Sequence, residues 1–259
     1  MLWFMYVCGY ANDMERREAL RRHYLDVMGI DLWESRVGVA RDTVAPVAVP
    51  PGKEPSVPAS TLRAEAVAPA ATSDAASMDW GTLEREVHTC TKCPLHESRT
   101  QAVFGVGNRQ AEWLFVGEAP GVQEDRQGEP FVGRAGQLLN AMLFALGLTR
   151  EQVYIANVLK CRPPNNRDPQ PAEVECCEPY LLRQIALLNP RLIVALGRHA
   201  AHSLLRTDLA LTRLRGRRLS YHGTPLIVTY HPAYLLRNPV DKRKVWDDLC
   251  LAKSVVESA

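Results

Sequence analysis

Four short apolar runs divide the C-terminal two thirds of the chain. The clearest is Trp113–Val116, which stops abruptly at the turn-forming sequence Gly117-Glu-Ala-Pro-Gly121. Apolar runs of this length, bounded by glycine and proline, are typical of buried strands. The other three runs are Val153–Val158, Leu192–Leu196 and Leu226–Tyr230. We therefore predict four strands.

Helical periodicity occupies the stretches between and around these runs. Apolar residues there recur three to four positions apart, as they do on one face of a helix. The expected helices are Leu83–Thr89, Ala135–Leu146, Pro171–Leu188, Arg198–Leu205 and Lys242–Val256. Strands that alternate with helices build a parallel sheet with helices on both faces and right-handed crossovers. The pattern predicts an α/β fold, a three-layer α/β/α arrangement around a central four-stranded parallel sheet.

The N-terminal third follows a different pattern. One face of residues 14–28 is apolar at helical spacing, and Gly29 ends that pattern. From about Val44 to Met78, alanine, proline, valine and serine dominate. This composition buries too little apolar surface to offset the entropy of ordering. We predict an N-terminal helical segment over residues 1–35, a disordered linker over 36–78 and a compact domain over 79–259.

Charge and composition exclude several classes of protein. The formal net charge of +2 is nearly neutral, so attraction to an anionic partner depends on local arginine clusters. The apolar run Leu2–Cys8 is far shorter than the ~20 residues of a membrane helix. It also lacks the basic region and cleavage site of a signal peptide. We expect a cytoplasmic protein with no membrane partner and with reduced or metal-bound cysteines.

Four cysteines are candidates for one metal centre. Cys90 and Cys93 form a C-x2-C pair, Cys161 follows the second predicted strand, and Cys177 lies in a predicted helix. Four thiolates suit zinc or an iron–sulfur cluster. Cys176 competes with Cys177 for the fourth position. Buried structural cysteines that bind no metal are the alternative interpretation.

Polar residues follow three of the predicted strands. Glu118 comes after the first, Asn157 ends the second, and His231 ends the fourth. Ligands of open α/β sheets bind beyond the carboxyl ends of the strands. Pro232 cannot donate to a ladder, so the strand should end at His231 and leave its imidazole pointing outward. Three convergent polar groups predict a site, although singly they also fit a turn acid, a capping amide and a surface histidine.

A glycine-rich loop and two basic clusters lie near this predicted edge. In Gly128–Gly136, Phe131 either stacks on a planar base or anchors a small core, and sequence alone favours the core. Basic residues gather at 212–218 and 242–244, with Arg237 between them. Their proximity to His231 favours phosphate binding over a solvated charged surface. The sequence lacks complete dinucleotide-binding and P-loop motifs.

In combination, these motifs resemble the family 4 uracil-DNA glycosylases over about Leu83 to Val255. The resemblance is carried by the C-x2-C pair, Gly117–Gly121, Pro130–Gly133, Asn157–Lys160, Cys161–Pro164 and the sequence from His231 to Arg237. It implies an α/β/α fold and a [4Fe–4S] cluster, with zinc as the alternative. It also implies base-excision repair of uracil in single- and double-stranded DNA. We expect a monomer associated with the nucleoid.

The resemblance implies roles for individual residues in the reaction. Phe131 would stack on the flipped uracil, Asn157 would hydrogen-bond the edge of the base, and His231 would stabilise negative charge on the departing uracil. Glu118 would position the attacking water, with Glu124 as a second candidate. A base inside a duplex is unreachable, so flipping it costs ~ a few kcal/mol.

Contacts to DNA are implied as well. Leu235 would enter the duplex and fill the gap left by the extruded base. Arg237, together with Arg213 and Arg215, would hold phosphates and offset part of the flipping cost.

The chain departs from the family 1 enzymes at two substrate-binding positions. Those enzymes carry an aspartate for the water and a tyrosine that blocks thymine, whereas Ala119 and Gly121 stand here. No lysine is placed at a strand end to form a Schiff base, so we predict a monofunctional glycosylase. Lys160 runs directly into Cys161, without the basic insertion of a covalent-trapping relative. We therefore expect turnover.

Two other functions fit parts of the sequence. A non-enzymatic nucleic-acid-binding module with a four-cysteine zinc site would use the cysteines and arginines alone. An α/β enzyme acting on free nucleotides would have little use for Leu235 or the arginine clusters. The layout of helix, linker and domain also suggests that the N-terminal segment tethers a repair-protein partner.

Overall fold

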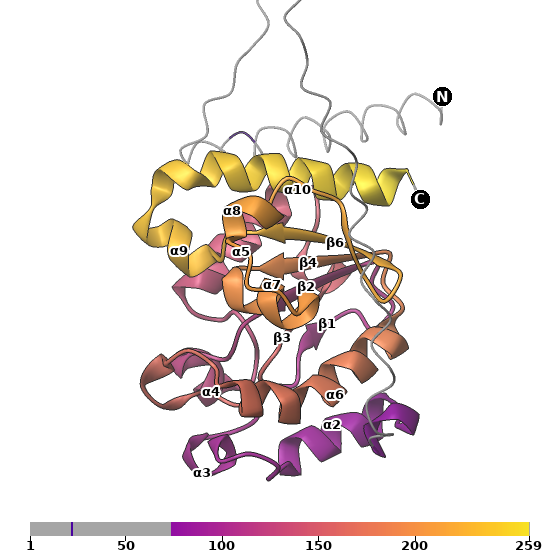
Figure 1. Cartoon of the computed structure of the whole chain (residues 1–259), viewed down its shortest axis with the longest axis vertical. Helices are drawn as coiled ribbons and strands as arrows, with labels where there is room; N and C mark the ends of the chain where they lie inside the picture. Colours follow the sequence, from indigo (N-terminus) through magenta and orange to yellow (C-terminus); the bar gives the residue numbers. More distant parts are fainter. Residues whose placement is uncertain (1–21, 23–73, 259) are drawn as a thin grey trace, which may run out of the picture. The chain divides into compact units, whose positions relative to one another are not determined.

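Figure 1 shows the computed structural model of the chain, which describes Arg22 and residues 74–258. The helix predicted over residues 1–35 and most of the linker predicted over 36–78 lie outside the described residues. Within the described part, every helix is too short or too polar to cross a membrane.

Strands and helices alternate along the described chain, as the apolar runs predicted. The strands are β1 Val106–Gly107, β2 Trp113–Gly117, β3 Tyr154–Asn157, β4 Leu192–Leu196, β5 Leu219–Tyr221 and β6 Thr224–Thr229. The α-helices are α2 Trp80–Thr89, α3 Leu95–Ser98, α4 Val122–Gln127, α5 Arg134–Ala145, α6 Pro171–Leu188, α7 Arg198–Leu205, α8 Leu211–Leu214, α9 Pro232–Arg237 and α10 Lys242–Glu257. Short 3-10 turns are η1 Asp74–Ser77, η2 Arg150–Gln152, η3 Pro164–Asn166 and η4 Pro239–Asp241.

The strands form one sheet in the order β1-β3-β2-β4-β6-β5. Its central strands β3, β2, β4 and β6 are parallel, which confirms the predicted four-stranded parallel core. The edge strands β1 and β5 are antiparallel and were not predicted. They contain two and three residues, too few to give a readable alternation of apolar and polar positions.

Helices cover both faces of the sheet because the central strands are apolar on both sides. Along β2, Trp113 and Phe115 pack with α5, α9 and α10, whereas Leu114 and Val116 pack with α6 and α7. In Figure 1, α10 (yellow) and α6 lie on opposite sides of the strands. The three-layer α/β/α arrangement is thus confirmed.

A separate apolar cluster joins the start of the described chain to α6. Ala75 of η1 is fully buried there, together with Tyr180 of α6 and the inner face of α2. Arg183 Nε donates a hydrogen bond to the Met78 carbonyl at 2.6 Å. Residues 74–78, assigned to the linker from their composition, therefore pack against the folded domain.

The strand register brings the predicted site to one edge of the sheet. Gly117 at the end of β2 pairs with Asn157 at the end of β3, and Leu196 of β4 pairs with Thr229 of β6. Strand β6 runs through Tyr230 into His231, the N-cap residue of α9. The residues that follow these strands therefore share the carboxyl edge, where such sheets bind ligands.

Candidate active site

Phe131, Asn157 and His231 meet at this edge. The rings of Phe131 and His231 stack with their centroids 5.5 Å apart and their planes inclined by 30°. A Cβ atom on Gly117 would lie 2.6 Å from Phe131 Cζ and would overlap Asn157 Oδ1. The space between these side chains thus exists because residue 117 is glycine. The fold brings together three residues that sequence analysis assigned to the site.

Asn157 holds an unpaired acceptor inside the protein. The residue is 2% exposed, and its Oδ1 atom has no hydrogen-bond partner in the structure. Its backbone carbonyl, in contrast, accepts a hydrogen bond from Lys160 Nζ at 2.9 Å. Leaving a buried acceptor unsatisfied costs about 1–3 kcal/mol. Such an atom marks a place where a ligand N–H can bind.

His231 presents a neutral imidazole to the same space. Its Nδ1 accepts a hydrogen bond from the Ala233 backbone N–H at 3.1 Å, which leaves the ring proton on Nε2. Burial, reinforced by the charge of Arg237, lowers the pKa of His231 to about 4. A Cβ on Gly197 would lie 2.9 Å from His231 Cβ, so this glycine allows the close approach of α7.

Glu118 lies on the same edge, beside two residues that sequence analysis missed. One ligand atom from each of Glu118, Asp168 and His199 lies within 4.8 Å of the other two. His199 Nε2 is 3.9 Å from Glu118 Oε2 and 3.3 Å from Asp168 Oδ2. Burial, followed by the charge of Asp168, raises the pKa of Glu118 to about 7, although Arg198 acts in the opposite direction. Glu118 therefore changes between its protonated and ionised forms near neutral pH.

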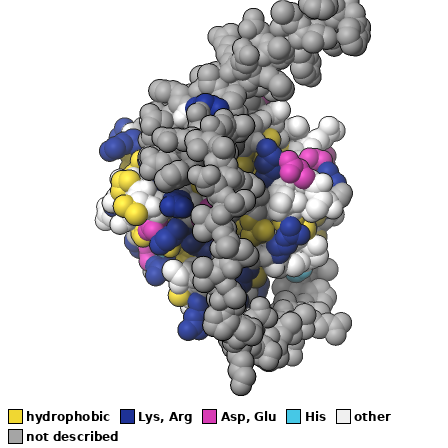
Figure 2. Space-filling model, turned by 90° about the horizontal axis from the view of Figure 1, so that it is seen from above, with side chains coloured by type: hydrophobic (Ala, Val, Ile, Leu, Met, Phe, Trp, Pro, Cys, Tyr) yellow, Lys and Arg dark blue, Asp and Glu magenta, His cyan; other side chains and the backbone are white. Residues whose placement is uncertain are grey.

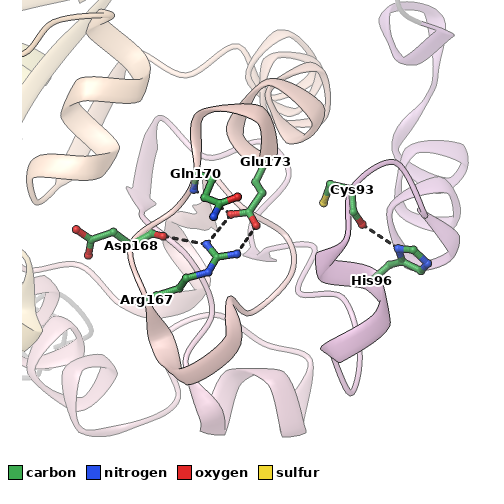
Figure 3. Close-up of polar contacts among 6 residues, drawn as sticks. All are labelled: Cys93, His96, Arg167, Asp168, Gln170 and Glu173. Carbon is green, nitrogen blue, oxygen red and sulfur yellow. Dashed lines mark hydrogen bonds and ion pairs between the residues drawn. The ribbon is translucent and has the colours of Figure 1, made fainter.

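An ion pair fixes the loop that carries Asp168. Arg167 contacts both carboxylate oxygens of Glu173, at 2.5 and 2.9 Å, and donates to the Asp168 carbonyl at 3.0 Å. Glu173 also accepts a hydrogen bond from the Gln170 backbone N–H at 2.9 Å. Figure 3 shows these contacts and the Asp168 carboxylate pointing away from them. Asp168 is thus free to face Glu118 and His199.

Glu124, the second candidate for positioning water, binds the loop that follows it. Its Oε1 accepts hydrogen bonds from the backbone N–H groups of Val132 and Gly133, both at 3.0 Å. The neighbouring residue Phe131 has a φ of 54° and is 6% exposed, so it belongs to the core as well as to the site. The core placement that the sequence favours is therefore observed, with the ring stacked on His231.

The two predicted substrate-binding positions after β2 face different surroundings. Ala119 packs against the cysteine cluster rather than against Phe131. Gly121 is the N-cap residue of α4, and a Cβ there would lie 2.7 Å from Glu124 Oε2. Gly121 therefore leaves room for the Glu124 carboxylate.

Leu235, which the resemblance places in the duplex, is buried in this DNA-free structure. Leu235 is 1% exposed and packs in the core between α5 and α10. The next residue, Leu236, is 39% exposed, and Val240 beyond it is 89% exposed. The helical register of α9 turns the second leucine, not the first, toward solvent.

Arg215 was also assigned incorrectly to phosphate binding. Its side chain is 13% exposed, forms an ion pair with Asp248 at 2.8 Å and lies 4.6 Å from the ring centroid of Tyr230. It joins the α8–β5 connection to α10. Arg213 and Arg237 are exposed, as phosphate contacts require. Figure 2 shows Lys and Arg side chains in several groups on the face that it views.

The cysteines of the predicted metal centre converge from three parts of the chain. Cys93, Cys161 and Cys177 are buried together, with Cys176 packed against them, whereas the partly buried Cys90 packs against the cluster of α2 and Tyr180. Among the described residues, no three cysteine sulfurs lie within 4.8 Å of one another. Arg99 donates a hydrogen bond to Cys161 Sγ at 2.9 Å.

Backbone contacts separate the ligand candidates further. Cys176 is partly exposed and its thiol contacts the Lys92 carbonyl at 3.3 Å, whereas Cys177 faces the buried cluster. The Cys93 carbonyl is held by His96 Nδ1 at 2.8 Å, as Figure 3 shows. The structure therefore favours Cys177 over Cys176 as the inward-facing thiol.

Comparison with known proteins gives a consistent family assignment. A family model described as "Uracil DNA glycosylase superfamily" matches residues 104–250. The type-4 uracil-DNA glycosylase of Archaeoglobus fulgidus is 52% identical over 165 residues, 61% of this chain and 83% of the relative. That of Thermotoga maritima is 46% identical over 179 residues, 68% of this chain and 93% of the relative. That of Saccharolobus solfataricus is 43% identical over 182 residues, 67% of this chain and 84% of the relative.

Proposed function

The chain belongs to the type-4 uracil-DNA glycosylases of the uracil-DNA glycosylase superfamily, and from this premise we propose how its strand-end site works. The protein is a DNA-repair hydrolase that releases uracil from DNA. The reaction cleaves the N-glycosidic bond with water and leaves an abasic site. The uracil must first leave the base stack, at a cost of ~ a few kcal/mol.

The unpaired carbonyl of Asn157 is the observation that carries this proposal. Uracil presents a donor at N3 and an acceptor at O4, so one carboxamide can satisfy both through Oδ1 and Nδ2. Oδ1 is buried without a partner until a base supplies one. Phe131 offers a ring face beside it. Cytosine presents an acceptor at N3 and a donor at N4, the reverse pattern, and leaves the orphaned Oδ1 opposed to another acceptor.

His231 acts on the leaving group. As the glycosidic bond breaks, its electron pair moves into uracil and negative charge develops on O2. The Nε2–H of the neutral imidazole donates to that oxygen, because Nδ1 is already occupied by the Ala233 N–H. Removing one such donor typically lowers the rate by about 10²–10³-fold.

Glu118 orients the water that attacks the sugar. The transition state resembles an oxocarbenium ion, so a carboxylate that holds and polarises water suffices. A Schiff-base route has no suitable amine here. Lys160, the lysine nearest to Asn157 in the sequence, is 1% exposed. Its Nζ donates to the Asn157 carbonyl and to Gln184 Oε1. This supports a monofunctional enzyme without strand cleavage.

DNA lies across the face formed by α9 and its surroundings. Leu236 replaces Leu235 as the residue that enters the duplex, since it is the exposed leucine of the helix. Arg237 and Arg213 contact phosphates in single- and double-stranded DNA. We place the enzyme in the cytoplasm with the nucleoid, acting as a monomer.

The cysteines fit a [4Fe–4S] cluster better than zinc. A tetrahedral zinc site with Zn–S bonds of about 2.3 Å needs all four sulfurs about 3.8 Å from one another, whereas no three sulfurs of the described cysteines lie within 4.8 Å of one another. A four-iron cube holds its thiolates farther apart. Its ligands would be Cys90, Cys93, Cys161 and Cys177. Bound there, the cluster would cross-link the α2–α3 turn, the end of β3 and α6, which is a structural contribution.

A single-turnover excision assay tests the proposed reaction. Oligonucleotides with one uracil, cytosine or thymine are incubated with wild type, Asn157→Ala and His231→Ala. We expect uracil release only, slowed by about 10²-fold in either variant, and no strand cleavage before heat or alkali. His88→Ala on the exposed side of α2 is the matched control. Wild-type protein that binds DNA but releases no uracil would favour the non-enzymatic zinc module.

Metal analysis of the same preparations tests the cofactor. We expect iron with labile sulfide in wild type and in Cys176→Ser, and loss of both in Cys177→Ser. Equimolar zinc without iron would contradict the cluster. Loss of iron in Cys176→Ser but not in Cys177→Ser would identify Cys176 as the fourth ligand.

A further inference from the structure

We propose that Glu124 and Arg150 form a clamp that holds Phe131 in its stacking position, which makes both of them positioning residues for uracil excision. The proposal rests on the proposed function, because it assumes that uracil stacks on Phe131. It assigns Glu124 to the loop rather than to the attacking water. It adds Arg150, to which sequence analysis gave no role.

The backbone of Phe131 needs such a clamp. Its φ of 54° lies in the left-handed region, which a bulky residue other than glycine rarely occupies. The side chain and the carbonyl oxygen crowd each other there. A conformation of this kind persists only where neighbouring groups hold it, and such residues cluster at functional sites.

Opposite charges bind the two ends of this turn. On the N-terminal side, the Arg150 guanidinium of η2 donates to the Phe131 carbonyl at 3.2 Å and to the Pro130 carbonyl. On the C-terminal side, Glu124 Oε1 accepts from the N–H groups of Val132 and Gly133 at 3.0 Å. The cation therefore takes the carbonyls of Pro130 and Phe131, and the anion takes the amides of Val132 and Gly133. Charged partners make these hydrogen bonds strong.

Helix α5 closes the third side of the turn. A Cβ on Gly136 would overlap the Phe131 carbonyl oxygen, so the first turn of α5 lies directly against it. The Phe131 ring is then directed at His231, with a centroid distance of 5.5 Å, and at the space above Gly117. Glu124 and Arg150 bind the backbone around Phe131, and Glu124 also acts on His231 through its charge.

Two substitutions of Glu124 distinguish a residue that holds the loop from a general base that acts on water. In Glu124→Gln, the carboxamide oxygen still accepts from the two amides, so we expect single-turnover excision from single-stranded DNA within about 5-fold of wild type. Glu124→Ala should lose about 50-fold or more. Glu112→Gln, an exposed acid directly before β2, is the control and should match wild type. A Gln variant as slow as the Ala variant would show a catalytic carboxylate and overturn the proposal.

A double-mutant cycle tests whether the clamp acts through Phe131. In a Phe131→Ala background the clamp has no ring to position, so adding Glu124→Ala should slow excision by less than about 3-fold. If the two substitutions slow excision by factors that multiply in full, Glu124 acts independently of Phe131. That result would refute the clamp.

An NMR titration of DNA-free protein gives a readout that does not depend on activity. Arg150→Met removes the donors to both carbonyls, so Phe131 should leave the stack and water should reach His231. The pKa of His231 should then rise from about 4 toward its ordinary value, since Arg237, Glu124 and His199 are unchanged. An unchanged pKa overturns the clamp. If wild type releases no uracil, the proposed function fails and this titration still decides the clamp.

Discussion

Among single residues, Glu118 sets the pH dependence expected of the enzyme. Burial and the charge of Asp168 raise its pKa to about 7, and only the ionised carboxylate holds a water for attack. The single-turnover rate should therefore rise with pH to a plateau, with its midpoint near neutrality. His231, with a pKa of about 4, stays neutral throughout this range. A pH–rate profile from about pH 5 to about pH 9 measures this directly.

Variants of Glu118 and of its neighbour Asp168 show which group makes the excision rate rise with pH. Glu118→Gln should be slow and flat across the range. Asp168→Asn removes the charge that raises the pKa of Glu118, so the midpoint should move to lower pH, while Arg198 and His199 remain in place. A rising limb that survives unchanged in Glu118→Gln would assign the pH dependence to another group.

The adjacent leucines of α9 should respond in opposite ways to truncation. Leu235→Ala leaves a cavity in the core, so we expect a loss of about 3 kcal/mol in the free energy of unfolding. Leu236→Ala should leave stability within about 0.5 kcal/mol of wild type. It should slow excision from duplex DNA about 10-fold, with little effect on single strands, because only a duplex resists flipping. Denaturant melts and paired assays on both substrates measure this, and a duplex-specific defect in Leu235→Ala alone would restore the original assignment.

The sequence predicts the site residues that depend on strand ends, and misses those that depend on packing. Glu118, Asn157 and His231 each follow an apolar run, so their common edge could be inferred from the order of strands. The exposed face of a six-residue helix such as α9 could not, because two adjacent leucines fit either register. His199 reaches Glu118 only because α7 begins beside the end of β2.

Among the secondary-structure elements, the two arginines around α8 differ in their surroundings, because Arg215 is ion-paired inside the protein whereas Arg213, which we propose contacts DNA, is exposed. Arg215→Ala leaves Asp248, 2% exposed, without its cation, so we expect a loss of about 3 kcal/mol in stability. Arg213→Ala should be neutral for stability. It should reduce the slope of log K against log salt concentration for DNA binding by about 0.9, one phosphate contact. Thermal melts measure the effect on stability, and a salt titration of DNA binding measures the phosphate contact. A change of slope in Arg215→Ala but not in Arg213→Ala would show that Arg215, not Arg213, contacts the phosphate.

The sequence predicts the secondary-structure elements that are long and apolar. The four central strands and the long helices α6 and α10 follow from runs and periodicity. Glycines such as those of the loop over residues 128–136 let the backbone approach a ligand closely. Gly136 instead accommodates the Phe131 carbonyl of its own loop. A sequence pattern shows that the backbone comes close to something, and only the fold shows to what.

For the molecule as a whole, the placement of the cysteines depends on topology more than on local sequence. The C-x2-C turn precedes the sheet, Cys161 follows β3, and Cys177 lies on α6, so Cys93, Cys161 and Cys177 pack together only when the domain is folded. Lys160 connects this region to Asn157, because its Nζ bonds both the Asn157 carbonyl and Gln184 of α6. The cysteine cluster and the Asn157 backbone therefore share one framework.

Truncation from the N-terminus should show where the independent enzyme begins. All residues assigned to the pocket, the metal centre and the DNA face lie between Cys90 and Arg237. A chain starting at Ser73 should therefore excise uracil within about 2-fold of the full chain. A chain starting at Asp79 loses the buried Ala75 and the bond from Arg183 to the Met78 carbonyl. At about 2 kcal/mol for these contacts, its melting temperature should fall by about 4–8 °C.

Calorimetry and the excision assay on both truncated chains measure this difference. Equal melting temperatures would show that η1 adds nothing to the domain and would restore the boundary at residue 79 that composition predicts. A large loss of excision in the chain starting at Ser73 would show that residues 1–72 take part in the reaction. If activity is kept but binding to a repair protein is lost, those residues serve as the tether that their sequence pattern suggests.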